Sequence, residues 1–293
     1  MTVEVTVWNG THWTLSNGDP LPMVGFPNET NTGIAAVGLT IDDLTPYTGF
    51  GSFDTEASFN GYAFLAANMT NQYTRIDDGG YLQANRSYFD RRIDCDGPNR
   101  RLLLRNSTVN ANGDYVGVGF GNLEIYRCQI SNANNCINIG SNLILRDSYV
   151  FNPYLPPGSA DHINPIFHGG GGNLQIYHTT FWAPIPDNQN GGGVSTNLSL
   201  FPDFAPVYDV TIENCFIRYT YGAYGVSLGW NPGKDFNDHP LNGTNIVFRN
   251  NVFERGPSGV CGAIGPVTSW PFGRPGSVFE GNTYEDGEPV LAA

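Results

Sequence analysis

A nine-residue pattern recurs seven times between residues 101 and 284, and it limits the possible folds more than any other feature of this chain. Each copy has apolar residues at its second, fourth and ninth positions, with one exception at Ser277. The seventh position holds a small or amide-bearing residue, and the first is mostly Asn or Asp. The copies begin at Arg101, Asn122, Asn142, Asn173, Asp209, Asn245 and Gly276.

The distance between copies predicts how they are stacked. The first copies start 20 or 21 residues apart, which is typical of one coil of a β-solenoid. Later copies start 31 or 36 residues apart, as expected for the same coil with an insertion. A unit this short cannot bury its own apolar face, so the coils must stack. We therefore predict an all-β, right-handed parallel β-helix over residues 50–293. The alternatives are a β-sandwich, which needs seven coincidental copies, and a β-propeller, whose units usually run to about 40 residues or more.

Residues 1–49 differ from the rest of the chain. Alternating apolar residues flank Asn9-Gly10, a dipeptide that favours a β-hairpin. Residues 21–49 contain many Pro and Gly and show no periodicity. The open end of a solenoid exposes strand edges and core, so it needs a cap. We assign residues 1–49 to capping or to attachment to a neighbouring protein.

Charge and hydropathy exclude several kinds of partner. The net charge is -13 with only 14 Lys and Arg, so binding of nucleic acid through its phosphates is not expected. No run of 18 apolar residues occurs, and we predict no membrane insertion. The start of the chain lacks the basic and apolar regions of a signal peptide. Neutral glycans stay open as partners.

The five cysteines and one acidic stretch are the possible metal ligands. None of the cysteines forms a C-x-x-C pair, which argues against zinc. Buried free thiols are the favoured interpretation and disulfides the alternative. The stretch from Asp235 to Asp238 has too few ligands for a recognisable Ca²⁺ loop. We therefore expect no cofactor; Ca²⁺ stays possible but has no motif to support it.

The longer repeats carry aromatic insertions at residues 151–172, 182–208, 218–244 and 254–275. Equivalent points of a solenoid stack, so we expect these segments to form a wall or groove along one side. Sugar rings stack on exposed aromatic faces beside polar groups, and a contiguous patch would mark a binding site. The alternative is that the rings form a satellite core or contact other subunits. The selected glycan-binding candidates are Tyr154, Trp182, Tyr221 and Trp230.

Acid–base candidates are few. Asp161 and His162 are adjacent in the first insertion, with His168 close behind. Lys234, Asp235, Asp238 and His239 lie together in the third insertion. Glycoside hydrolysis needs two carboxylates roughly 5 to 9.5 Å apart, a separation that sequence does not reveal. Asp161 and His162 are the catalytic candidates, and solvated loop residues are the alternative.

Several segments resemble right-handed β-helix proteins of actinobacteria and their phages. Residues 25–33 and 44–49 are similar to the opening of such proteins, and residues 279–290 to their endings. Residues 7–13, Val-Trp-Asn-Gly-Thr-His-Trp, resemble N-terminal segments of actinophage minor tail proteins. Many group members carry an H-x-D-G-I-Q-like stretch, whose counterpart here, residues 159–164, has adjacent Asp and His and lacks the Gly and Gln. This departure puts any activity of that stretch in doubt.

The resemblance implies a fibre- or spike-like minor tail protein located in the virion tail, made in the host cytoplasm without a signal peptide. It would be a homotrimer that contacts host cell-wall glycans and joins other tail proteins through its N-terminal segment. We expect a structural, non-catalytic or weakly catalytic role. The alternative is a polysaccharide lyase or glycoside hydrolase, because β-helices host both and the fold alone does not choose.

Overall fold

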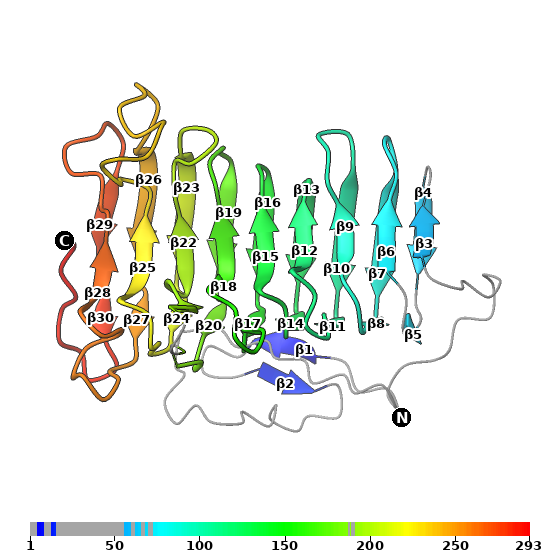
Figure 1. Ribbon diagram of the computed structural model, residues 1–293, viewed down its shortest axis with the longest axis horizontal. Helices are drawn as coiled ribbons and strands as arrows, with labels where there is room; N and C mark the ends of the chain where they lie inside the picture. Colours follow the sequence, from blue (N-terminus) through cyan, green and yellow to red (C-terminus); the bar gives the residue numbers. More distant parts are fainter. Residues whose placement is uncertain are drawn as a thin grey trace.

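The chain is a right-handed parallel β-helix in which three parallel sheets run the length of the molecule (Figure 1). The computed structural model describes residues 73–293 except 187, 189 and 190, together with the backbone of five earlier strands. Successive strands enter the three sheets in turn, so each coil adds one strand to every sheet. No helix that could span a membrane occurs among the described residues.

Sheets I and II are formed by the two halves of the nine-residue repeat. Sheet I contains β4 (Tyr62–Leu65), β7 (Tyr81–Asn85), β10 (Arg101–Arg105), β13 (Asn122–Tyr126), β16 (Leu143–Arg146), β19 (Leu174–Tyr177), β23 (Tyr208–Glu213), β26 (Thr244–Arg249) and β29 (Val278–Glu280). Sheet II contains β5 (Asn68–Met69), β8 (Tyr88–Phe89), β11 (Thr108–Asn110), β14 (Gln129–Ser131), β17 (Tyr149–Phe151), β20 (Thr180–Trp182), β24 (Phe216–Ile217), β27 (Val252–Phe253) and β30 (Thr283–Tyr284).

Sheet III lies between successive copies of the repeat. It contains β3 (Glu56–Phe59), β6 (Tyr73–Ile76), β9 (Ile93–Cys95), β12 (Val116–Phe120), β15 (Asn135–Ile139), β18 (His162–His168), β22 (Leu198–Leu200), β25 (Tyr224–Leu228) and β28 (Gly265–Thr268). The short strand β21 (Gly193–Val194) pairs with the beginning of β18.

The repeat explains the core. Equivalent residues pair in register from coil to coil, as Leu104 does with Ile125 and Val109 with Ile130. The apolar residues at positions two, four and nine are buried in one continuous core, as predicted, except Phe279, which is partly buried and packs against it. At the Ser277 exception, the hydroxyl donates to the carbonyl of Gly243 and accepts from the amide of Ile246.

Position seven forms a hydrogen-bonded ladder inside the helix. The Ser148 hydroxyl accepts from the Cys128 amide one coil earlier, at 3.1 Å. The Asn251 side chain accepts from the Cys215 amide at 2.9 Å in the same way. All of these side chains are buried. Small and amide-bearing residues are therefore needed at this position because they satisfy backbone groups that the bend between sheets I and II leaves unpaired.

The bend itself lies at position six, which the sequence pattern did not single out. The position-six residue has φ between 49° and 64° in each copy of the repeat. Asn, Asp and Gly adopt this left-handed conformation readily, and four of the seven repeat copies use Asn or Asp there. The predicted turn at position one also exists, since Asn142 and Asn173 both have φ of 61°.

The insertions do not lie along one side, and this prediction was wrong. Each one is interrupted by its sheet III strand, so its residues divide between two edges of that sheet. One set of turns leads from sheet II into sheet III, at residues 152–161, 183–197, 218–223 and 254–264. The other set leads from sheet III to sheet I, at residues 169–173, 201–207, 229–243 and 269–277. Sheet III was missed because only the two strands of the repeat have a recognisable pattern.

The predicted hairpin around Asn9-Gly10 is present at the start of the chain. Strands β1 (Val5–Trp8) and β2 (Trp13–Leu15) pair antiparallel, with Trp8 opposite Trp13. The predicted capping role of residues 1–49 otherwise falls outside the described residues. At the other end, Trp270 and Val290 join the core beside the last coil. The Trp270 ring meets Phe279 edge-on, with centroids 5.2 Å apart.

All five cysteines are free and buried. Burial raises the pKa of the Cys128, Cys136 and Cys215 thiols to about 12, because an apolar surrounding disfavours the thiolate. The thiolate is the reactive form, so these cysteines are inert packing residues in the folded chain.

Candidate functional site

A groove of about 720 Å³ lies over the last coils of sheet III. Its floor is the outer face of β25 and β28, where Ser227 and Thr268 pair in register. Val226 and Leu228 point into the core on either side of Ser227, so the Ser227 side chain points outward. The turns at the two edges of sheet III rise beside this floor and form the walls.

Aromatic side chains contribute much of the groove. Phe201, Trp230 and Phe272 come from turns between sheets III and I, and Tyr224 comes from the start of β25. Phe272 is 67% exposed, whereas Trp270 is only 6% exposed and also belongs to the core. The groove therefore presents rings that range from anchored to freely accessible.

Cations hold two of these rings in place. The Arg274 guanidinium lies 4.6 Å from the centroid of Trp230, and the Lys234 ammonium lies 5.2 Å from that of Phe201. Lys234 is itself paired with Asp203 at 2.7 Å. The backbone amide of Trp230 donates to the carbonyl of Ser269, which joins two successive turns. These contacts order the aromatic wall before any ligand binds.

The polar groups of the groove are mostly hydroxyls. Ser195, Thr196, Ser227, Thr268 and Ser269 line it. The Ser227 Oγ atom is buried and has no hydrogen-bond partner among the residues that the structure describes. No Asp, Glu, Lys or Arg side chain is among the described residues that line the groove. Rings flanked by neutral hydrogen-bonding groups suit an uncharged, hydroxyl-rich ligand.

The structure brings Trp230 and His162 into the groove and places the other glycan-binding candidates elsewhere. Tyr221 is 44% exposed and meets Tyr219 edge-on in the turn before β25. Tyr154, in the turn before β18, packs over Gly113, whose missing side chain leaves room for the ring. Neither tyrosine lines the groove.

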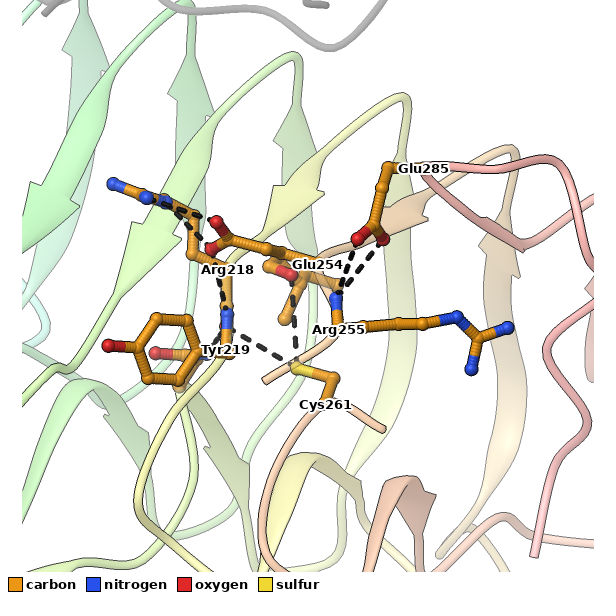
Figure 2. Close-up of polar contacts among 8 residues, drawn as sticks. Arg218, Tyr219, Glu254, Arg255, Cys261 and Glu285 are labelled. Atoms are coloured by element: carbon orange, nitrogen blue, oxygen red, sulfur yellow. Dashed lines mark hydrogen bonds and ion pairs between the residues drawn. The ribbon is translucent and has the colours of Figure 1, made fainter. Parts of the chain in front are cut away.

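Trp182 lies on the outer face of sheet II, away from the groove residues. The Arg218 guanidinium covers its ring at 4.1 Å from the centroid. Figure 2 shows the ion pair that holds this guanidinium, in which Arg218 Nε donates to the Glu254 carboxylate at 2.9 Å. One face of the Trp182 ring is therefore occupied by a cation rather than available to a sugar.

The catalytic candidates do not form an acid–base pair with another groove residue. His162 is exposed at the start of β18, where it lines the groove. The Asp161 carboxylate accepts from the Asn134 side chain at 3.2 Å and is not among the lining residues. In the third insertion, Lys234 pairs with Asp203, and Asp238 accepts from Asn237. The roles of Asp161 and His162 stay predictions.

His168, also in the first insertion, is a buried structural residue. It is fully buried, with Nδ1 3.2 Å from the carbonyl oxygen of Ile139 and Nε2 3.3 Å from that of Gly171. Burial lowers the pKa of His168 to about 4, because the apolar interior disfavours the imidazolium. Its ring therefore holds the turn after β18 in neutral form.

Sequence reasoning missed the hydroxyls of the groove. Tyr224, Trp270 and Phe272 belong to the aromatic residues of the insertions but were not selected. Ser227 and Thr268 could have been found only by recognising that each insertion contains a third strand. The signal is Val-Ser-Leu at residues 226–228, in which one polar residue lies between two apolar ones.

Comparison with known proteins adds no identification. No family model, curated protein or solved structure matches this chain. Among the described residues, no three His, Cys, Asp or Glu side chains gather as they would to hold a metal ion. The similarity to actinophage tail proteins therefore stays a prediction from the sequence.

Proposed function

We propose that this chain is a minor tail protein of a phage that binds neutral glycans of the host envelope through the groove on sheet III, without a catalytic role. The observation that supports this proposal is the lining of the groove, in which Trp230, Tyr224 and Phe272 lie beside neutral hydroxyls. The described lining residues include no pair of carboxylates. Apolar ring faces pack against the C–H surfaces of sugars while hydroxyls fix their orientation. The virion tail is the location that this function implies.

Replacing Trp230 with alanine should weaken glycan binding about tenfold or more, because a central aromatic anchor carries a large share of binding energy. The measurement is binding to an array of neutral and uronic-acid polysaccharides, with affinities of positive spots determined by calorimetry. Tyr221→Ala is the matched control, since this tyrosine is exposed outside the groove. Equal loss in both variants, or none in Trp230→Ala, would remove the groove as the binding site.

The same polysaccharides should stay intact. An assay for new reducing ends and for unsaturated uronic acids should give no signal above the buffer control. Release of either product by the wild-type chain would replace the binding proposal with the hydrolase or lyase alternative. His162→Gln and Asp161→Asn would then be the first variants to assay.

A fibre- or spike-like role also implies a homotrimer. Light scattering should give a solution mass about three times that of the protomer, because a fibre or spike of this kind is expected to close with threefold symmetry. A protomer mass at all accessible concentrations would contradict the trimer. A monomeric mass would not affect the glycan-binding proposal, which the binding assay tests separately.

A further inference from the structure

The outer face of sheet II differs from that of sheet I. It carries an apolar strip made of Tyr149, Phe151, Trp182, Phe216 and Val252. Tyr149 and Phe151 stack face to face at 4.1 Å. Sheet I has a charged ladder on its outer face instead, in which Arg146 lies over Tyr177 and Arg249 pairs with Glu213. The sheet II strip is thus the apolar flank of the helix.

Side chains of this face are buried within a single chain. Tyr149 is 8% exposed and Phe216 is 9% exposed, although both precede core residues and therefore point outward. Thr180 lies between Tyr149 and Phe216 on neighbouring strands of sheet II and is fully buried. Thr108, on an earlier strand of the same sheet, is 7% exposed. Neighbours on the same face lie beside these side chains rather than above them. A layer over the sheet, supplied by the same chain, would account for the complete burial of this outward threonine.

The hairpin of β1 and β2 has the properties needed for this layer. Its strands have the sequences Val-Thr-Val-Trp and Trp-Thr-Leu, rich in β-branched and aromatic residues. A two-stranded hairpin is marginally stable alone and needs a surface to pack against. Residues 16–55 separate β2 from β3, and 40 residues can span on the order of 130 Å. The hairpin can therefore reach any coil of the strip.

We propose that the β1–β2 hairpin packs face to face on the sheet II strip of its own chain and shields it from solvent. Two β-sheets that stack in this way bury a shared apolar layer between them. The hairpin then acts as a clamp along the flank of the helix, across several coils, rather than only as a cap on the first coil. This inference is independent of the groove on sheet III and of any glycan.

The cysteine chemistry of the chain provides a direct test. All five native thiols are buried, so the folded wild-type chain should react slowly with a thiol reagent such as DTNB. A cysteine introduced as Thr180→Cys places one near-isosteric thiol under the proposed hairpin. It should react slowly in the full chain. With Trp8→Ser and Trp13→Ser added, its reaction rate should rise at least tenfold.

A matched variant separates shielding from general loosening. Val278→Cys lies on the outer face of sheet I at a residue that is 37% exposed. Its rate should be fast, and the same with or without the two tryptophan substitutions. Circular dichroism should show that every variant keeps its β-structure.

Three outcomes would overturn the proposal. Fast reaction of Thr180→Cys in the full chain would show that the face is open. A slow rate that rises on dilution, together with an oligomeric mass, would show that a second copy covers the face. A slow rate that the tryptophan substitutions leave unchanged would assign the cover to another segment.

Discussion

Replacing Asn251 with leucine is expected to lower the free energy of unfolding by about 3 kcal/mol or more. Asn251 is buried, accepts from the Cys215 amide and donates through Nδ2 to the carbonyl of Ile212 at 3.1 Å. Leucine has a similar volume but offers neither group, so a donor and an acceptor are left buried without partners. Each buried donor or acceptor without a partner costs about 1–3 kcal/mol. Urea unfolding followed by circular dichroism measures the change.

The control is Asn251→Ser, because serine performs the same task in other coils. Ser107 and Ser148 each accept from the position-seven amide one coil earlier, at 3.0 and 3.1 Å. Serine at position 251 should therefore keep the bond to Cys215 and cost clearly less than leucine. If the two variants were equally destabilised, the ladder would have no special energetic role and packing volume would decide.

Lowering the pH from 7 to 5 is expected to destabilise the protein by about 2 kcal/mol through His168 alone. The pKa of this histidine is about 4 in the folded chain, against 6.5 as the ordinary value. The unfolded chain therefore binds more protons between these two values, and protonation favours unfolding. The stabilisation is complete above pH 6.5 and is lost as the pH falls toward 4.

The measurement is the difference in unfolding free energy between pH 7 and pH 5 for wild type and His168→Asn. The variant should be less stable at pH 7 but should lose about 2 kcal/mol less than wild type on acidification. His162→Asn removes an exposed histidine and serves as the control for the loss of one imidazole. Parallel curves for His168→Asn and wild type would contradict the shifted pKa.

The fold could be predicted because the core residues recur at fixed positions of a short local repeat. Leu104, Ile125 and Leu145 stand at the same place in successive copies and stack in register. The third sheet could not be predicted in this way, because its strands differ in length and lie among insertions. Because these strands were not recognised, the insertions were predicted to form a wall or groove along one side, whereas their turns lie at two edges of sheet III.

The candidate site was less accessible to sequence reasoning for a related reason. Trp230 and Trp182 look equivalent in the sequence, since both lie in the aromatic insertions. They differ only in the edge of the helix from which they project and in their partners. Arg218 covers Trp182 on sheet II, and Trp230 contributes to the groove on sheet III. Such differences depend on contacts between residues distant in sequence.

Trp270 belongs both to the core beside the last coil and to the lining of the groove. Its amide also donates to the carbonyl of Ala293, so the last residue of the chain is held by the same tryptophan. If the groove binds glycan as proposed, Trp270 would serve both ligand binding and the packing of the last coil, so the two could not be varied independently. Under that proposal, a change of ligand preference would have to come from exposed rings such as Phe272, because replacing the buried Trp270 would also disturb the core.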